Sequence, residues 1–173
     1  AFWVYLPLVA EAAGQADQAV SGAISLALAG QVAGGLAAIA LSRRVHPVAA
    51  FVGCTGALGV TIVAMTASDS APLLTAAAFI FNAAWMFAPP FQLPLLMALD
   101  PEHRAALYIS PAQLGGMAAG PALAAAALDS LGAGGPVTVA LALLAAGLLL
   151  FGFALLAARR RSLTVPLAGE AVR

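Results

Sequence analysis

The chain has 173 residues, of which 63% are hydrophobic and only 8% are charged, and its formal net charge is zero. A soluble globular domain carries about 25% charged residues. The composition of this chain therefore excludes a soluble globular domain. Zero net charge and the lack of a large basic cluster also argue against a nucleic-acid partner. The single cysteine excludes a disulfide framework and a cysteine-rich metal site.

The chain begins inside an apolar stretch, Phe2 to Ala10. No basic region precedes this stretch and no cleavage pattern follows it, so it does not resemble a signal peptide. We expect residues 1–13 to be the end of a truncated transmembrane helix. On this interpretation the N-terminal part of the protein is missing from the sequence.

Five further stretches are long and apolar enough to cross a bilayer, whose core of about 30 Å needs roughly 20 residues of helix. Short breaks rich in charged residues, proline and glycine separate them, which predicts antiparallel neighbours. The sequence therefore predicts an all-α, multi-pass transmembrane bundle over residues 20–158. Its expected spans are 20–41, 48–67, 72–99, 105–128 and 136–158.

The charges predict the orientation of these spans. With alternating crossings, all the arginines near span ends fall on one side: Arg43, Arg44, Arg104 and residues 159–161. The opposite side carries acids and no arginine. Because basic loops stay in the cytoplasm, we expect residues 159–173 to form a cytoplasmic tail. The arginine, alanine and glycine bias fits a GC-rich genome, and we expect a bacterial cell (inner) membrane.

Three of the five spans carry carboxamides, whereas 48–67 and 136–158 contain none. An unpaired polar group in hydrocarbon costs several kcal/mol, so the carboxamides must face protein or a water-filled cavity. Span midpoints fall near Gln31, Trp85 and Gly116, with Asn82 and Gln113 within about 5 Å of that depth. The predicted substrate-binding residues are Gln31, Asn82, Trp85, Gln113 and, nearer the cytoplasm, Gln92. The alternative is that these carboxamides only hydrogen-bond the helices together.

Glycine and proline mark where helices approach closely or bend. Gly30 and Gly34, and likewise Gly116 and Gly120, are four residues apart, a spacing that allows close helix packing but is common in any bundle. Three prolines interrupt the span 72–99 and two interrupt 105–128, which predicts kinks.

No Asp, Glu, Lys, Arg or His lies inside the predicted spans, and both histidines lie in loops beside arginines. No pair of His, Glu or Asp lies at ligand spacing within a predicted helix, and no serine–histidine dyad lies at membrane depth. We therefore expect neither an enzyme, a cofactor nor a metal site.

The run from Asn82 to Ala127 resembles the tenth and eleventh helices of major facilitator superfamily transporters. It has an aromatic and proline-rich span, a D-x-x-x-R turn at Asp100–Arg104, and a glycine-rich helix with Gly120-Pro121. The preceding AGQVAGGLAAIALSRRVHP resembles the eighth helix and its basic loop, with Ser42 in place of the family's acidic residue. The resemblance covers nearly the whole chain, from the end of helix seven to helix twelve.

This resemblance implies the C-terminal half of a 6+6 fold that carries a small solute by alternating access. The implied partners are that solute, the bilayer and the missing N-terminal half, and helices nine and twelve would be peripheral. The alternative is a non-transport membrane scaffold or assembly subunit. A small homodimeric transporter is a third possibility. Six further spans upstream in the full-length protein would distinguish the half-transporter from the scaffold and from the homodimeric transporter.

Overall fold

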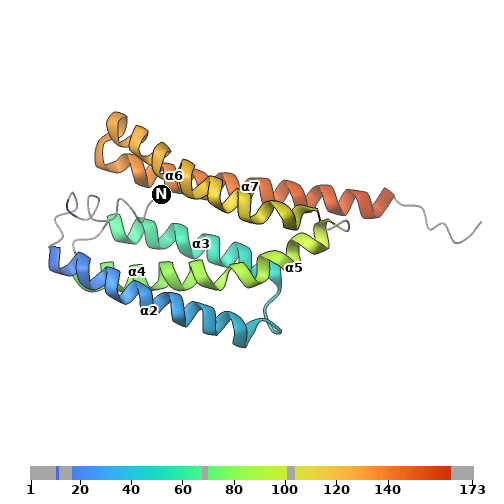
Figure 1. The fold of residues 1–173 in the computed structure, drawn as a ribbon, viewed down its shortest axis with the longest axis horizontal. Helices are drawn as coiled ribbons and strands as arrows, with labels where there is room; N and C mark the ends of the chain where they lie inside the picture. The colour runs from blue at the N-terminus through green and yellow to red at the C-terminus, as the bar shows by residue number, and fades with distance from the viewer. Residues whose placement is uncertain (1–10, 12–16, 68–69, 101–103, 165–173) are drawn as a thin grey trace, which may run out of the picture.

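The computed structural model describes residue 11 and residues 17–67, 70–100 and 104–164, and this part of the chain contains helices and turns but no strand. The long helices lie roughly alongside one another (Figure 1). They are α2 (Asp17–Leu41), α3 (Pro47–Thr66), α4 (Ala71–Phe87), α5 (Pro89–Leu99), α6 (Ile109–Leu131) and α7 (Gly135–Thr164). The expected segment 1–13 lies outside the described residues, apart from Glu11.

Within the described residues, four helical stretches are long and apolar enough to span a membrane. The last, Ile109–Ala158, has 50 residues and would extend about 75 Å if it were straight. The short 3-10 helix η3 (Gly132–Gly134) folds it into two adjacent helices, α6 and α7 (Figure 1). Gly132 begins this turn with φ of 64°, a conformation that glycine adopts without steric cost.

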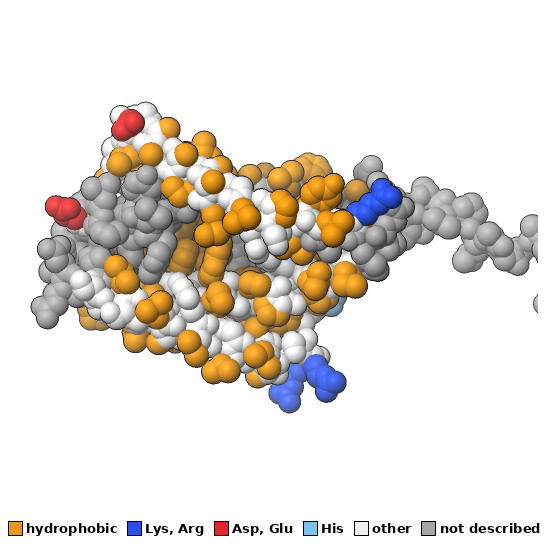
Figure 2. Space-filling model, viewed as in Figure 1, with side chains coloured by type: hydrophobic (Ala, Val, Ile, Leu, Met, Phe, Trp, Pro, Cys, Tyr) orange, Lys and Arg blue, Asp and Glu red, His pale blue; other side chains and the backbone are white. Residues whose placement is uncertain are grey.

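The outer surface carries large apolar side chains, which suits hydrocarbon and not water (Figure 2). Leu36 on α2, Val60 on α3 and Leu150 on α7 are each more than 60% exposed. One buried cluster joins α2, α3, α4 and α7, with Met65, Leu74 and Ala78 near its centre. A smaller one, Ala38, Ala50 and Phe91, joins the end of α2 to the starts of α3 and α5.

The expected span 72–99 is two helices that meet at Ala88. Pro89 and Pro90 have no N–H group, so the carbonyls of Trp85 and Met86 lose their helical donors. The Phe91 N–H donates to the Ala88 carbonyl at 3.1 Å, a tighter turn than an α-helix makes. The backbone therefore leaves acceptors without main-chain helical donors at this break.

Charged groups occupy the two ends of the bundle. Figure 2 shows acidic side chains at one end and arginines at the other. Arg43 and Arg44 follow α2, and Arg104 precedes the short 3-10 helix η2 (Ala105–Tyr108) just after α5; α2 and α5 end on the same side of the bundle (Figure 1). Asp100 also lies there, and its carboxylate accepts the Ala105 N–H at 2.6 Å, which ties the end of α5 to the start of η2.

Loop residues also shape the helix starts. The Nδ1 atom of His46 accepts the Val48 N–H at 3.3 Å and so caps α3, a structural role for this histidine. At the other end of the chain, α7 continues through Thr164, six residues into the expected tail 159–173. The rest of that tail lies outside the described residues.

Candidate functional site

Two of the predicted site residues form a direct hydrogen bond between helices. The Nε2 group of Gln31 on α2 donates to Oδ1 of Asn82 on α4 at 3.0 Å. Asn82 is buried, and its Nδ2 group donates to the Ala78 carbonyl one turn earlier, also at 3.0 Å. Both polar atoms of the Asn82 side chain therefore have a partner within the bundle, which favours an interhelical hydrogen bond as the role of this residue.

Glycine brings the two helices close enough for this bond. A Cβ atom on Gly34 would lie 2.7 Å from the Ala83 Cα and closer still to its carbonyl oxygen. A Cβ atom on Gly30 would lie 3.1 Å from the Phe79 carbonyl carbon. Only glycine fits where backbone meets backbone at such distances, so the Gly30–Gly34 pair sets the spacing between α2 and α4.

Gln31 keeps one polar atom available. Its Oε1 atom accepts no hydrogen bond from the described residues. Every buried side-chain nitrogen and oxygen atom among these residues has a hydrogen-bond partner, so an atom without a partner is not buried. The Oε1 atom is therefore accessible at the surface of the α2–α4 pair. Asn82 holds the Gln31 amide by its nitrogen and leaves this oxygen free to accept a hydrogen bond.

Trp85 and Gln92 follow Asn82 on the α4–α5 segment. Trp85 is 57% exposed at the last turn of α4, just before the proline break, and Gln92 is half-buried on α5. Trp85, whose indole is an amphipathic group, is one of the two residues whose backbone carbonyls lack helical donors. Asn82 is thus covered by the described helices, whereas Trp85 is largely exposed and Gln92 partly so.

Gln113 lies apart from the other four residues. It is on α6, which packs chiefly on α7, and its side chain is exposed and has no hydrogen bond to a described residue. Residues 110–119 are exposed all round, with Met117 71% exposed, and α6 meets α7 through its second half near Ala124 and Ala127. The structure therefore joins Gln31 to Asn82 but does not bring Gln113 to them.

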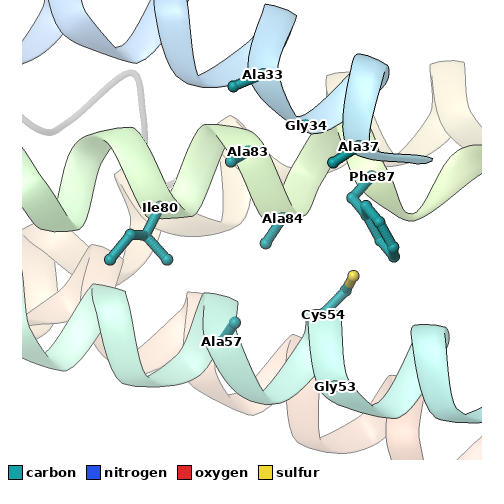
Figure 3. Close-up of a pocket in the computed structure, with 10 residues that line it drawn as sticks. All are labelled: Ala33, Gly34, Ala37, Gly53, Cys54, Ala57, Ile80, Ala83, Ala84 and Phe87. Atoms are coloured by element: carbon teal, nitrogen blue, oxygen red, sulfur yellow. The ribbon is translucent and has the colours of Figure 1, made fainter. Parts of the chain in front are cut away.

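A groove of about 340 Å³ runs between α2, α3 and α4 (Figure 3). Its lining has no charged, amide or hydroxyl side chain. Phe87 and Cys54 point toward one another at one end (Figure 3). The sequence analysis did not identify this groove. The signal that could have found it is the repeat of small residues on two helices: Ala33, Gly34 and Ala37 on α2, and Gly53 and Ala57 on α3.

The chemistry available here is hydrogen bonding by neutral groups and apolar contact. Among the described residues, no three His, Cys, Asp or Glu side chains lie close enough to hold a metal ion. The two polar regions, at Gln31–Trp85 and at Gln113, contain acceptors, donors and an aromatic ring but no charge. Such surfaces suit binding of a neutral or amphipathic molecule.

Comparison with protein families, with curated proteins and with solved structures finds no match to this chain.

Proposed function

We propose that the chain is the C-terminal half of a major-facilitator-type secondary transporter, which moves a small solute across the membrane by alternating access. One observation carries the proposal: the exposed amide of Gln113 lies on an apolar helix whose surrounding turns have no protein cover. Such an amide in hydrocarbon costs several kcal/mol, so in the membrane it needs water, a solute or another helix.

The proline break supports a hydrated face on the same protein. Carbonyls without helical donors are tolerated at membrane depth only where protein or water supplies a donor. Trp85 at this break is largely exposed, so the described helices do not cover the region. We assign Trp85 and the Oε1 atom of Gln31 to the solute path, with Asn82 as a positioning residue that orients Gln31. Gln92 lies nearer the arginine end of that path.

The partner of this half would be six further helices. In this fold the solute path lies between two halves, and each half supplies one wall. The first two to three turns of α6 are exposed on all sides and carry Gln113, as expected for a helix that faces the N-terminal half of the transporter on one side. The neutral lining favours a neutral or amphipathic solute, and a coupling residue, if the transporter uses protons, would lie in the other half.

We place the protein in a bacterial cell membrane with the arginine end in the cytoplasm. In a Cys54→Ala background of the full-length protein, a single cysteine at Ser130 should react with an impermeant thiol reagent added outside intact cells. A cysteine at Ser42, at the opposite end, should react only after the cells are opened. Both serines are exposed, so access to the reagent depends on the side of the membrane. Labelling of Ser42 in intact cells would reverse the orientation.

Binding and stability measurements test the assigned roles. A solute that binds the full-length protein raises its melting temperature, which allows a screen of small neutral and amphipathic compounds. For such a solute, Gln113→Ala and Trp85→Ala should each weaken affinity about tenfold with little change in stability, because the loss is one contact to the solute. Asn82→Ala should instead lower the free energy of unfolding by about 0.6 to 2 kcal/mol, because it breaks the bond to Gln31.

The scaffold alternative gives a different pattern in the same experiment. The Gln31–Asn82 hydrogen bond is the observation that favours it, since this pair links α2 to α4. If the carboxamides only hold helices together, Gln113→Ala would lower stability and no compound would raise the melting temperature. Leu150→Ala, on an apolar exposed position of α7, is the matched control and should leave binding unchanged.

A further inference from the structure

Two arginines project from the bundle where α2 ends. Arg43 and Arg44 are both exposed, and within the described part of the chain neither guanidinium pairs with a carboxylate. Ser42, beside them, is also exposed, and its hydroxyl donates to the Ile39 carbonyl at 3.0 Å. This turn therefore presents two positive charges that the described residues leave uncompensated.

The apolar groove between α2, α3 and α4 lies directly below this turn. Ala37, on the α2 side of the groove, is six residues before Arg43, which is about 9 Å along the helix axis. Gly53, on the α3 side, is likewise six residues after Pro47, the first residue of α3. Ala40 and Ala49 are small and exposed between the groove and the turn, beside the buried contact of Phe91 with Ala38 and Ala50.

We propose that this surface binds one anionic phospholipid, with the phosphate on Arg43 and Arg44 and an acyl chain in the groove. Charge complementarity identifies the head group, because arginine pairs with phosphate through two parallel hydrogen bonds. The apolar lining identifies the tail, since the groove offers no polar partner. The 9 Å offset matches the arrangement of a lipid, whose charge sits at the interface and whose chains lie below it.

The membrane itself supplies this ligand. The cytoplasmic leaflet is rich in anionic lipid, and each basic residue near its surface adds about 1 kcal/mol of attraction. A protein helix would be a poorer occupant, because a helix about 10 Å across needs more room than a groove of about 340 Å³ provides. A single acyl chain is thin and flexible enough to follow the alanine and glycine surface.

Native mass spectrometry of the full-length protein tests the proposal, with phosphatidylglycerol and phosphatidylcholine of identical acyl chains as probes. We expect one phosphatidylglycerol to bind in preference to phosphatidylcholine. Arg43→Gln should weaken this binding about fivefold, and Arg43→Gln with Arg44→Gln about 25-fold. Arg104→Gln, which removes an arginine from the same end but from the α6 side, is the matched control and should have little effect.

A second pair of variants tests the acyl-chain part. A Cβ atom on Gly53 or on Gly56 meets nothing within 4 Å, so neither position is closed to a side chain by a neighbouring backbone, but only Gly53 lines the groove. Gly53→Leu should abolish the preferential binding, whereas Gly56→Leu should preserve it. Equal binding of both lipids overturns the proposal. Loss in the arginine variants with full binding in Gly53→Leu also overturns it, because the head group alone would then account for the affinity.

Discussion

Replacing Gly34 with leucine is expected to lower the free energy of unfolding of the full-length protein by about 3 kcal/mol, the upper end of the range for overpacking. The new side chain would meet the Ala83 backbone, with its Cβ 2.7 Å from the Ala83 Cα. The Ala83 backbone cannot rotate away from the new side chain as a neighbouring side chain could, so α2 and α4 must separate. Separation would also break the Gln31–Asn82 hydrogen bond. Unfolding in mixed micelles, followed by circular dichroism, measures the change.

Gly35→Leu is the matched control for this variant. It lies one residue further along the same helix, and a Cβ atom there meets nothing within 4 Å. Leucine is also a better helix former than glycine by roughly 0.8 kcal/mol or less, so stability should hold or rise slightly. Equal losses in the two variants would mean that α2 and α4 are not in close backbone contact.

Residue spacing alone could predict some of this packing and not the rest. Gly30 and Gly34 were predicted as a possible close contact, and both meet the α4 backbone. Glycines also recur at short, regular spacing on α3, at positions 53, 56 and 59. None of them would have a neighbour within 4 Å of an added Cβ atom. The difference depends on which face of a helix another helix covers, and the glycine pattern carries no information about that face.

The polar residues show the same limit. The sequence predicts that Gln31, Asn82 and Gln113 share one depth, a prediction drawn from the limits of the expected spans and the rise of a helix. It could not show that Gln31 and Asn82 bond each other, since that depends on how α2 and α4 are rotated. The groove went unnoticed for a related reason: it is made by residues that are too small to fill the space between three helices.

The helix ends departed from the predicted spans where local chemistry outweighed hydropathy. The sequence showed that prolines interrupt residues 72–99, and the chain divides at Ala88 because two consecutive prolines remove two donors. At the C-terminal end, α7 passes the expected limit at residue 158 because arginine is a good helix former in the next turn. Hydropathy predicts which residues lie in the membrane, whereas the helix itself can continue past the membrane surface.

The central claim is that Gln113 lines a solute path that opens alternately to each side of the membrane. Access of a water-soluble reagent to this position tests the claim without knowledge of the solute. In the full-length protein with Cys54→Ala, the variants Gln113→Cys and Leu150→Cys each carry one cysteine. The positions lie eight residues from Ala105 and Ala158, respectively, so both are about 12 Å from a span end. Both are exposed in the structure, and only their surroundings in the membrane should differ.

The measurement is the extent of labelling by an impermeant thiol reagent added to either side of sealed vesicles that contain the protein in one orientation. Alternating access predicts that Gln113→Cys reacts from both sides, because water reaches it in each state, and that Leu150→Cys reacts from neither, because it faces lipid. Failure of Gln113→Cys to react from either side would contradict the account, since the amide would then be packed against a helix in a static bundle.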